Sequence, residues 1–299
     1  MKSTLFCLLV AAAIATETVP WYLDRIDQAK LPLDGRANRT GTGAGVHAYV
    51  IDTGVRRTHV DFGGRADWVG DFVAGSPASQ DAADCDVPDS QGHGTHVASI
   101  LGGERFGVAP GVRLHALRIL PCTGTTRTEY DAAVRAVEWI TTHGQRPAVV
   151  NISPARWKTA DARLDEAILQ SIAAGFMYVL SAGGMDDIAA YSPQRVGAAL
   201  KVAGTDRTDH AGPADYGPTL TLFAPGVAIE AAGNTSDQAT FTADGDSYAA
   251  PVVAGIIALY LEQHPRATPA EVKAAVIGSA TGDVVIGVGM SPNLLAHLI

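Results

Sequence analysis

Short apolar runs alternate along the chain with longer stretches in which apolar residues recur at helical spacing. The short runs, rich in Val, Ile and Leu, predict strands at residues 46–51, 112–120, 148–152 and 176–180. Apolar positions three and four residues apart predict helices at 129–142 and 161–174. Strands that alternate with helices favour an α/β domain whose mostly parallel sheet is covered by helices on both faces.

Two more helices are predicted near the C-terminus. The apolar stretch at 248–261 is interrupted by Pro251, and its length suits a core helix better than a membrane span. Thr268 and Glu271 form a capping-box pattern around Pro269, which predicts a helix that ends at about Gly278. No internal repeat or linker divides the chain, so residues 16–299 are expected to form one domain.

The first fifteen residues have the pattern of a secretory signal peptide. Lys2 supplies the positive start, residues 5–14 are apolar, and Ala13-Ile14-Ala15 is a small-x-small cleavage site. Cleavage is expected after Ala15, and the alternative is a buried N-terminal helix. We therefore expect a secreted, extracellular protein with no membrane association once residues 1–15 are removed.

Charge and cysteine content narrow the class of partner and the compartment. The 299 residues carry a net charge of −9, which argues against nucleic acid, because a protein that binds a polyanion normally presents a basic surface. Signal removal takes Cys7 away and leaves Cys85 and Cys122. In an oxidising compartment this even pair predicts one disulfide, and the alternative is two separate buried thiols.

Three polar residues lie where strands are expected to end or helices to begin, the usual place for a site in an α/β sheet. Asp52 follows the first strand, His93 opens a helix, and Ser247 opens the apolar helix. A Ser hydroxyl becomes a good nucleophile when a His takes its proton and a carboxylate orients that His. A helix N-terminus adds backbone N–H groups that face the developing oxyanion. The chain order Asp, His, Ser is that of subtilisin.

At these residues the chain resembles the subtilases, the subtilisin-like serine proteases, and within them the proteinase K-like branch with an aqualysin-type pattern. The matching motifs are VIDTG at 50–54, HGTH at 93–96, SYAAP at 247–251, WYLDRIDQ at 21–28 and LFAPG at 222–226. The resemblance implies a three-layer α/β sandwich and hydrolysis of peptide bonds through an acyl-enzyme. It implies that Ser247 is the nucleophile, that His93 relays the proton and that Asp52 orients His93.

The oxyanion side of the expected site departs from the family pattern. Where the family has an Asn that donates to the oxyanion, this chain has Gly184. Loss of one such donor in a subtilisin costs about 10²–10³ in turnover. The residue before the nucleophile, usually Thr in the family, is Asp246. Its carboxylate either opposes the oxyanion charge or caps the helix.

The expected substrate-binding edges differ as well. The family's Ser-Leu-Gly-Gly becomes Ser153-Pro154-Ala155-Arg156, so Pro154 removes a backbone donor and the next two residues add side chains. The opposing edge runs through Gly124. We expect a narrowed or redirected pocket for the first substrate residue, bordered by Ser153, Ala155 and Gly124.

The resemblance also bears on structural ions. Asp24, Asp27 and Gln28 match an N-terminal calcium site of some relatives, and their spacing puts three oxygen ligands on one helical face. The alternative there is a solvated helix face. The acidic run at residues 81–89 is expected to be a solvated loop rather than a cation site. No cofactor is expected to be required for the reaction, and calcium would be a structural ion. The resemblance also supports the disulfide predicted above.

Two functions are consistent with these residues. The first is a secreted, monomeric serine endopeptidase that acts on peptides or proteins and is slowed by Gly184. The second is a catalytically silent subtilase fold that binds peptides or proteins. The Asp52, His93 and Ser247 set favours the endopeptidase. Gly184, Asp246 and the lack of a recognisable propeptide after the signal favour the silent protein.

Overall fold

The computed structural model describes residues 19–73, 83–84, 92–121, 129–153, 157, 159–184, 186–214 and 216–299. The signal peptide predicted at residues 1–15 and the disulfide predicted between Cys85 and Cys122 lie outside the described residues. Among the described residues, no helix combines the length and the apolar content that a membrane crossing requires.

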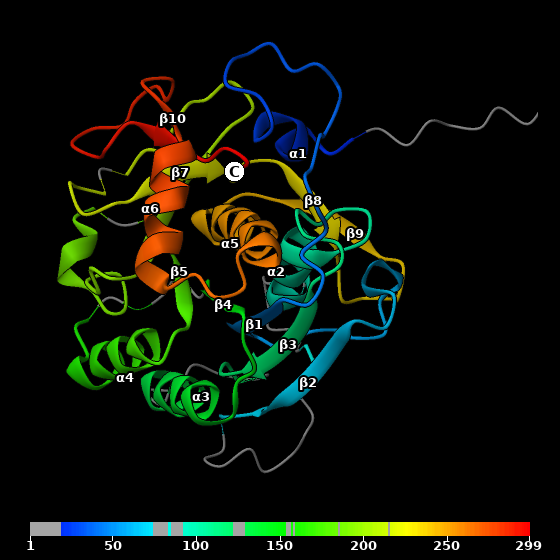
Figure 1. The fold of residues 1–299 in the computed structure, drawn as a ribbon, viewed down its shortest axis with the longest axis vertical. Coiled ribbons are helices and arrows are strands. Elements are labelled where there is room, and N and C mark those ends of the chain that lie inside the picture. The colour runs from blue at the N-terminus through cyan, green and yellow to red at the C-terminus, as the bar shows by residue number, and fades with distance from the viewer. Residues whose placement is uncertain are drawn as a thin grey trace, which may run out of the picture.

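A largely parallel sheet forms the middle layer of the molecule (Figure 1). Its strands, in chain order, are β1 (His47–Asp52), β2 (Ala66–Asp71), β3 (Arg113–Arg118), β4 (Ala148–Ile152), β5 (Met177–Ser181), β6 (Leu200–Thr205), β7 (Leu222–Pro225), β10 (Thr281–Gly282) and β11 (Leu294–Leu295). Within the described residues the spatial order is β10-β11-β7-β6-β5-β4-β1-β3-β2, and only the β10–β11 pair is antiparallel. A separate antiparallel hairpin joins β8 (Ile229–Ala232) to β9 (Thr240–Ala243).

Helices cover both faces of this sheet. Their bounds are α1 (Trp21–Arg25), α2 (His93–Gly102), α3 (Glu129–His143), α4 (Ala162–Ala173), α5 (Asp246–Gln263) and α6 (Pro269–Ser279), with short 3₁₀ turns at Val60–Phe62 and Ile188–Ala190. One core cluster packs α2 and α5 against one face, and a second packs α3 and α4 against the other. Figure 1 shows α2 beside α5 near the centre of the view and α3 beside α4 at its lower edge. The predicted three-layer α/β sandwich is confirmed.

The predicted elements agree closely with those observed. The four predicted strands are β1, β3, β4 and β5, and the four predicted helices are α3, α4, α5 and α6, with every end within two residues of its prediction. The sequence pattern did not indicate β2, β6, β7 or the β8–β9 hairpin. At Thr268 the capping box is formed as predicted, with both reciprocal hydrogen bonds present.

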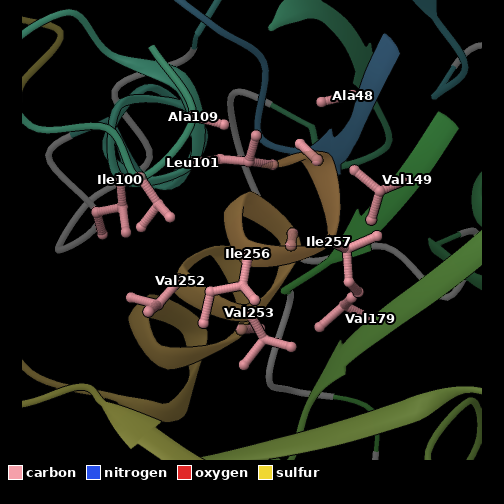
Figure 2. Packing of buried hydrophobic residues seen from close by; sticks show 14 of the residues in the cluster. Ala48, Ile100, Leu101, Ala109, Val149, Val179, Val252, Val253, Ile256 and Ile257 are labelled. Carbon is pink, nitrogen blue, oxygen red and sulfur yellow. The ribbon is translucent and has the colours of Figure 1, made fainter. Parts of the chain in front are cut away.

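Helix α5 is the centre of the larger core. It is apolar around its whole circumference because it lies between the sheet and the neighbouring helices. Figure 2 shows side chains of α5, among them Val253 and Ile257, beside Val149 of β4 and Val179 of β5, with Leu101 of α2 close by. The packing fixes the N-terminus of α5 against the carboxyl ends of the central strands, where the predicted site residues lie.

The N-terminal helix is fastened to the rest of the domain by a buried ion pair. The Arg25 guanidinium donates to both carboxylate oxygens of Asp209, at 2.7 and 3.0 Å. Only 1% of the Arg25 side chain and 7% of the Asp209 side chain are exposed. A buried, bidentate pair of this kind strongly destabilises a protein when one partner is removed.

Candidate active site

Asp52 and His93 meet at the ends of neighbouring elements. Asp52 is the last residue of β1 and is fully buried, and His93 is the first residue of α2. The His93 Nδ1–H donates to Asp52 Oδ1 at 2.7 Å, and the Thr53 N–H donates to the same oxygen at 2.7 Å. With Nδ1 bearing the proton, Nε2 is the basic nitrogen of the neutral imidazole. This is the orientation that a general base next to a serine requires.

The close approach of these two elements depends on Gly94. A Cβ built at Gly94 would lie 2.1 Å from the Gly54 carbonyl oxygen, so only glycine fits between the β1 end and α2. The Gly94 N–H donates to the Thr53 hydroxyl at 2.8 Å, which adds a second link between the two motifs.

The Asp84 carboxylate, which belongs to neither motif, links the VIDTG segment to the HGTH segment. Asp84 accepts hydrogen bonds from the Thr53 hydroxyl, at 2.6 Å, and from both the N–H and the hydroxyl of Thr95. Burial, with a smaller contribution from the Asp52 carboxylate, raises the pKa of the Asp84 carboxyl to about 6 against the lowering effect of these hydrogen bonds. The interpretation of the acidic run as a solvated loop is therefore wrong for Asp84, whereas the other acidic residues of the run lie outside the described residues.

Ser247 is the second residue of α5, where helix N–H groups have no partner within the helix. Its carbonyl is also exceptional, because the residue four positions later is Pro251, which has no N–H to donate. The Ser153 hydroxyl donates to that carbonyl at 3.0 Å and replaces the missing helix bond. In return the Ser247 hydroxyl donates to the Ser153 carbonyl at 2.9 Å. Ser153, at the end of β4, therefore fixes both polar groups of Ser247.

Buried polar side chains support Ser153 in turn. The Asn151 side-chain amide donates to the Ser153 hydroxyl at 2.8 Å, which leaves that hydroxyl free to donate to Ser247. The Ser181 hydroxyl donates to the Ser153 carbonyl at 3.0 Å, and Gln194 donates to the Ser181 carbonyl at 2.9 Å. The ends of β4 and β5 are thereby joined beneath the N-terminus of α5.

The ring of Tyr248 connects the Ser247 side of the site to the His93 side. Its centroid lies 5.4 Å from that of His93 and 4.7 Å from that of His96. His96 is fully buried, forms a hydrogen bond through Nε2 with the Ile229 carbonyl at 3.1 Å, and has its pKa lowered to about 3 by burial and by His93. It is a packing residue of α2, whereas His93 faces the site and is partly exposed.

Asp246, the residue before Ser247, contacts a different set of segments from those around His93. Its carboxylate accepts from the Gly184 N–H at 2.6 Å, from the Gly204 N–H at 2.8 Å and from the Tyr216 hydroxyl at 3.1 Å. The interpretation of Asp246 as a helix cap is wrong, because the N-cap of α5 is Gly245 and no side chain caps the helix. Burial raises the pKa of the Asp246 carboxyl, and the hydrogen bonds from Gly204, Gly184 and Tyr216 lower it.

Gly184 is exposed at the end of β5, beside the N-terminus of α5. It has φ of +66°, in the left-handed region, and a Cβ built on it meets no atom within 4 Å. Its N–H is bound by Asp246, and it has no side chain. Of the predicted substrate-binding residues, Ser153 and Gly184 thus lie at the site, whereas Ala155 and Gly124 lie outside the described residues.

The residues predicted to bind calcium are brought together around the loop that follows α1. Asp24 accepts from the Gly35 N–H at 2.8 Å, and Asp27 accepts from the N–H and the side-chain amide of Asn38 at 2.6 and 2.9 Å. Gln28 donates to backbone carbonyls of this loop. In the part of the chain that the structure describes, no group of three His, Cys, Asp or Glu side chains could hold a metal ion. The carboxylates accept from N–H donors of the loop, and calcium binding stays a prediction of the resemblance.

Several residues of the site could not be identified from the sequence. Tyr216 and Gly204, which bind Asp246, lie 30 and 42 residues before it and belong to no motif. Asp84 was within an acidic run whose members look alike in sequence. Only the contact between Ser153 and Ser247 had a signal in the sequence. Pro251 lies inside a predicted helix, and a proline there leaves a carbonyl that needs a donor from outside the helix.

Comparison with known proteins gives the same family from sequence and from structure. Residues 43–294 match the model of the subtilase family. An extracellular serine proteinase of Thermus sp. strain Rt41A is 43% identical over 96% of this chain and 68% of its own length. The alkaline serine exoprotease A of Vibrio alginolyticus is 37% identical over 96% of this chain and 52% of its own length.

Among solved structures, a cold-adapted subtilisin-like serine proteinase superposes with a TM-score of 0.86 at 34% identity, covering 94% of this chain and 99% of that one. The helices and strands that carry Asp52, His93 and Ser247 lie within residues 43–294, which the family model matches. The chain belongs to the subtilase family.

Proposed function

We propose that the chain is a secreted serine endopeptidase in which Ser247 attacks the peptide carbonyl, His93 relays the proton and Asp52 orients His93. Subtilases are serine endopeptidases, and the relatives from Thermus and Vibrio are named as an extracellular proteinase and an exoprotease. Peptides or proteins are therefore the proposed substrates, and a monomer acting outside the cell is the proposed form.

The proposed reaction begins when the Ser247 hydroxyl, which donates to the Ser153 carbonyl in the structure, turns towards His93. The Ser247 hydroxyl gives its proton to His93 Nε2 as its oxygen bonds to the carbonyl carbon, and the protonated imidazole is stabilised by Asp52 through the 2.7 Å Nδ1 bond. The tetrahedral oxyanion accepts from the Ser247 N–H at the start of α5. His93 then protonates the leaving amine, and a water molecule, activated by the same His93, hydrolyses the acyl-enzyme.

We propose that turnover is slow in comparison with typical subtilases. Gly184 supplies no side-chain donor, and its N–H is already bound to the Asp246 carboxylate. The Ser247 N–H is thus the main proposed oxyanion donor. A missing donor costs about 10²–10³ in kcat in a subtilisin, and we expect a reduction of this order here.

The observation that carries the proposal is the short bond between His93 and the buried Asp52, which supports the role of the imidazole as a general base. The test is hydrolysis of a Phe-containing peptide anilide by the chain without residues 1–15. Ser247→Ala is the matched control, because it keeps the fold and removes only the hydroxyl. We expect the unaltered chain to exceed the Ser247→Ala rate clearly.

Equal rates in two folded proteins would contradict the proposal for this substrate. A set of peptides with acidic, basic, small and large residues before the scissile bond then completes the test, since Pro154 and Arg156 alter the expected substrate edge. If none is cleaved, the chain is the catalytically silent binding protein, and the family comparisons do not favour that outcome.

A further inference from the structure

We propose that Asp246 is a positioning residue that anchors the oxyanion side of the active site, by fastening the Gly183–Gly184 turn and strand β6 to the first turn of α5. This inference rests on the proposed function, because it concerns how the chain places the oxyanion donor without a side chain at position 184. Asp246 itself touches neither the substrate nor the reacting atoms in this role.

The carboxylate joins three segments that are far apart in the sequence. Oδ2 accepts from the Gly184 N–H at 2.6 Å, and Oδ1 accepts from the Gly204 N–H at 2.8 Å and the Tyr216 hydroxyl at 3.1 Å. Both oxygens therefore act as acceptors, and 8% of the residue is exposed. Charge-assisted bonds to a buried carboxylate are about twice as strong as neutral ones, so a single side chain holds the ends of β5 and β6 against α5.

The glycines around Asp246 allow this geometry. Gly183 and Gly184 have φ of +85° and +66°, a conformation that turns the Gly184 N–H towards α5 and that side chains rarely adopt. A Cβ on Gly204 would lie 3.5 Å from Asp246 Oδ1, and a Cβ on Gly226 would lie 2.8 Å from the Gly204 Cα. The Gly204 distance is an ordinary van der Waals contact, so the tight position is Gly226, where only glycine lets the chain lie this close to Gly204 and to the Gly245 carbonyl, 2.9 Å from the built Cβ.

Asp246 would affect catalysis by fixing the distance between the Ser247 N–H and the Gly183–Gly184 turn. The Ser247 N–H directly follows Asp246 at the start of α5, and the Gly183–Gly184 turn forms the neighbouring wall of the site. Asp246 fixes the separation of the two. A displacement of about 1 Å between a donor and the reacting group can cost about 10² in rate. A carboxylate that only stabilised the fold would instead affect unfolding without affecting kcat.

The experiment compares Asp246→Asn with two controls. Asn has the shape of Asp but presents an NH₂ group to one of the two backbone donors, so one anchoring bond is replaced by a repulsive contact. We expect kcat to fall about 10–100-fold with KM changed less than about twofold. Tyr216→Phe removes one donor and keeps both backbone bonds, so its fall in kcat should be much smaller. Asp209→Asn removes another buried carboxylate and weakens its ion pair with Arg25, so it should lower Tm while leaving kcat unchanged.

A second readout does not depend on turnover. In the unaltered chain the exposed Gly184 should have an amide proton that exchanges slowly with solvent, because Asp246 binds it. In Asp246→Ala, which has no acceptor for either backbone N–H, that protection should be lost, and in Tyr216→Phe it should remain. Nuclear magnetic resonance with Gly184 assigned measures all three. Should Asp246→Asn fail to fold, Asp246→Thr keeps at most one of the two backbone bonds and serves in its place.

The outcomes separate this inference from the proposed function. Fast exchange at Gly184 in the unaltered chain, or an Asp246→Asn variant with lowered Tm and unchanged kcat, would overturn the inference and leave the endopeptidase intact. An unaltered chain that cleaves no peptide above the Ser247→Ala rate would remove the proposed function. Slow amide exchange at Gly184 that depends on Asp246 would then show that Asp246 holds the turn in place, but without a catalytic role.

Discussion

The two halves of the candidate active site are each built around a carboxylate that is not itself a member of the proposed triad, the half-buried Asp84 and the buried Asp246. On the Asp52–His93 half, Asp84 accepts from the hydroxyl of Thr53, which follows Asp52, and from Thr95, which lies in the first turn of α2 with His93. On the Ser247 half, Asp246 accepts from Gly184, Gly204 and Tyr216. In both halves one side chain holds strand ends and a helix N-terminus in place.

The halves differ in what that carboxylate leaves available for the reaction. Asp84 holds Thr53 and Thr95 and leaves the bond between His93 and Asp52 in place at 2.7 Å. Asp246 accepts a hydrogen bond from the Gly184 N–H. Gly184 stands at the position where the resemblance to the family implies an Asn that donates to the oxyanion. We call Asp52–His93 the relay half and Ser247–Gly184 the oxyanion half of the proposed enzyme. The difference teaches that the first keeps the short bond a proton relay needs, while the second has one backbone N–H bound to a carboxylate. The relay half keeps the residues of the family motifs. In the oxyanion half, contacts of Asp246 with backbone N–H groups take the place of side-chain contacts.

The largest expected effect breaks the relay half. Asp52→Asn keeps the shape of the side chain but favours the wrong imidazole tautomer, and kcat should fall by about 10⁴ at neutral pH. Steady-state hydrolysis of the peptide anilide measures it, with Asp209→Asn as a control for loss of a buried carboxylate. A fall of less than tenfold would mean that the Asp52–His93 bond does not serve the reaction.

The next effect repairs the oxyanion half. Gly184→Asn should raise kcat about 10–100-fold, because it restores a side-chain donor of the kind whose loss costs about 10²–10³ in a subtilisin. The open space beside Gly184 and its φ of +66°, which Asn tolerates better than most residues, allow the substitution. Gly184→Ala is the matched control, since it meets the same backbone conformation without a donor. Equal rates for the Asn and Ala variants would contradict the account.

A smaller effect tests how the nucleophile is held. Ser153→Ala removes the donor to the Ser247 carbonyl that Pro251 leaves without a helix partner, and it should lower the free energy of unfolding by about 1–3 kcal/mol. In a Pro251→Ala background the helix itself can supply an N–H, so the same substitution should be less destabilising. Urea denaturation of the four proteins gives the coupling. Additive free energies would show that the two residues do not share this carbonyl.

The smallest effect concerns the pH dependence of the relay half. The pKa of Asp84 is raised to about 6 in the folded protein, above its ordinary value of 3.8, so the folded state binds this proton more tightly. Its contribution to stability is therefore greatest below pH 3.8 and is lost as the pH rises through about 6.

Asp84→Asn cannot titrate, so the Tm of the unaltered chain minus that of the variant should decrease as the pH is raised through this window. Thermal unfolding of both proteins at half-unit pH steps measures the difference. A difference that stays constant with pH would exclude this role for Asp84.

Sequence reasoning reached the relay half and most of the fold because both depend on local signals. The strands β4 and β5 are nearly continuous apolar runs, as buried parallel strands are, and β1 and β3 combine apolar residues with His or Arg. Asp52 and His93 lie directly at element ends. Strand β6 contains Lys, Ala and Gly, and the shorter β7 contains Ala and Pro, so neither has a pattern that differs clearly from that of a loop.

The oxyanion half could be predicted only as far as the missing Asn. The partners of Asp246 are backbone N–H groups and a tyrosine brought together by the fold, and backbone donors leave no mark in the sequence. The same sequence pattern, an Asp at the start of a helix, is typical of a cap, and here tertiary contacts compete successfully for the carboxylate.

The most direct test of the central claim, a functional relay beside a weakened oxyanion site, is mass spectrometry of the chain mixed with a peptide p-nitrophenyl ester. An activated ester acylates readily, and hydrolysis of the acyl-enzyme needs the same oxyanion donors, so the acylated form should accumulate. The account predicts the added acyl mass on the peptide that contains Ser247, faster loss of that mass in Gly184→Asn, and no acylation in His93→Ala. Acylation that is absent from the unaltered chain, or equal in His93→Ala, would contradict it.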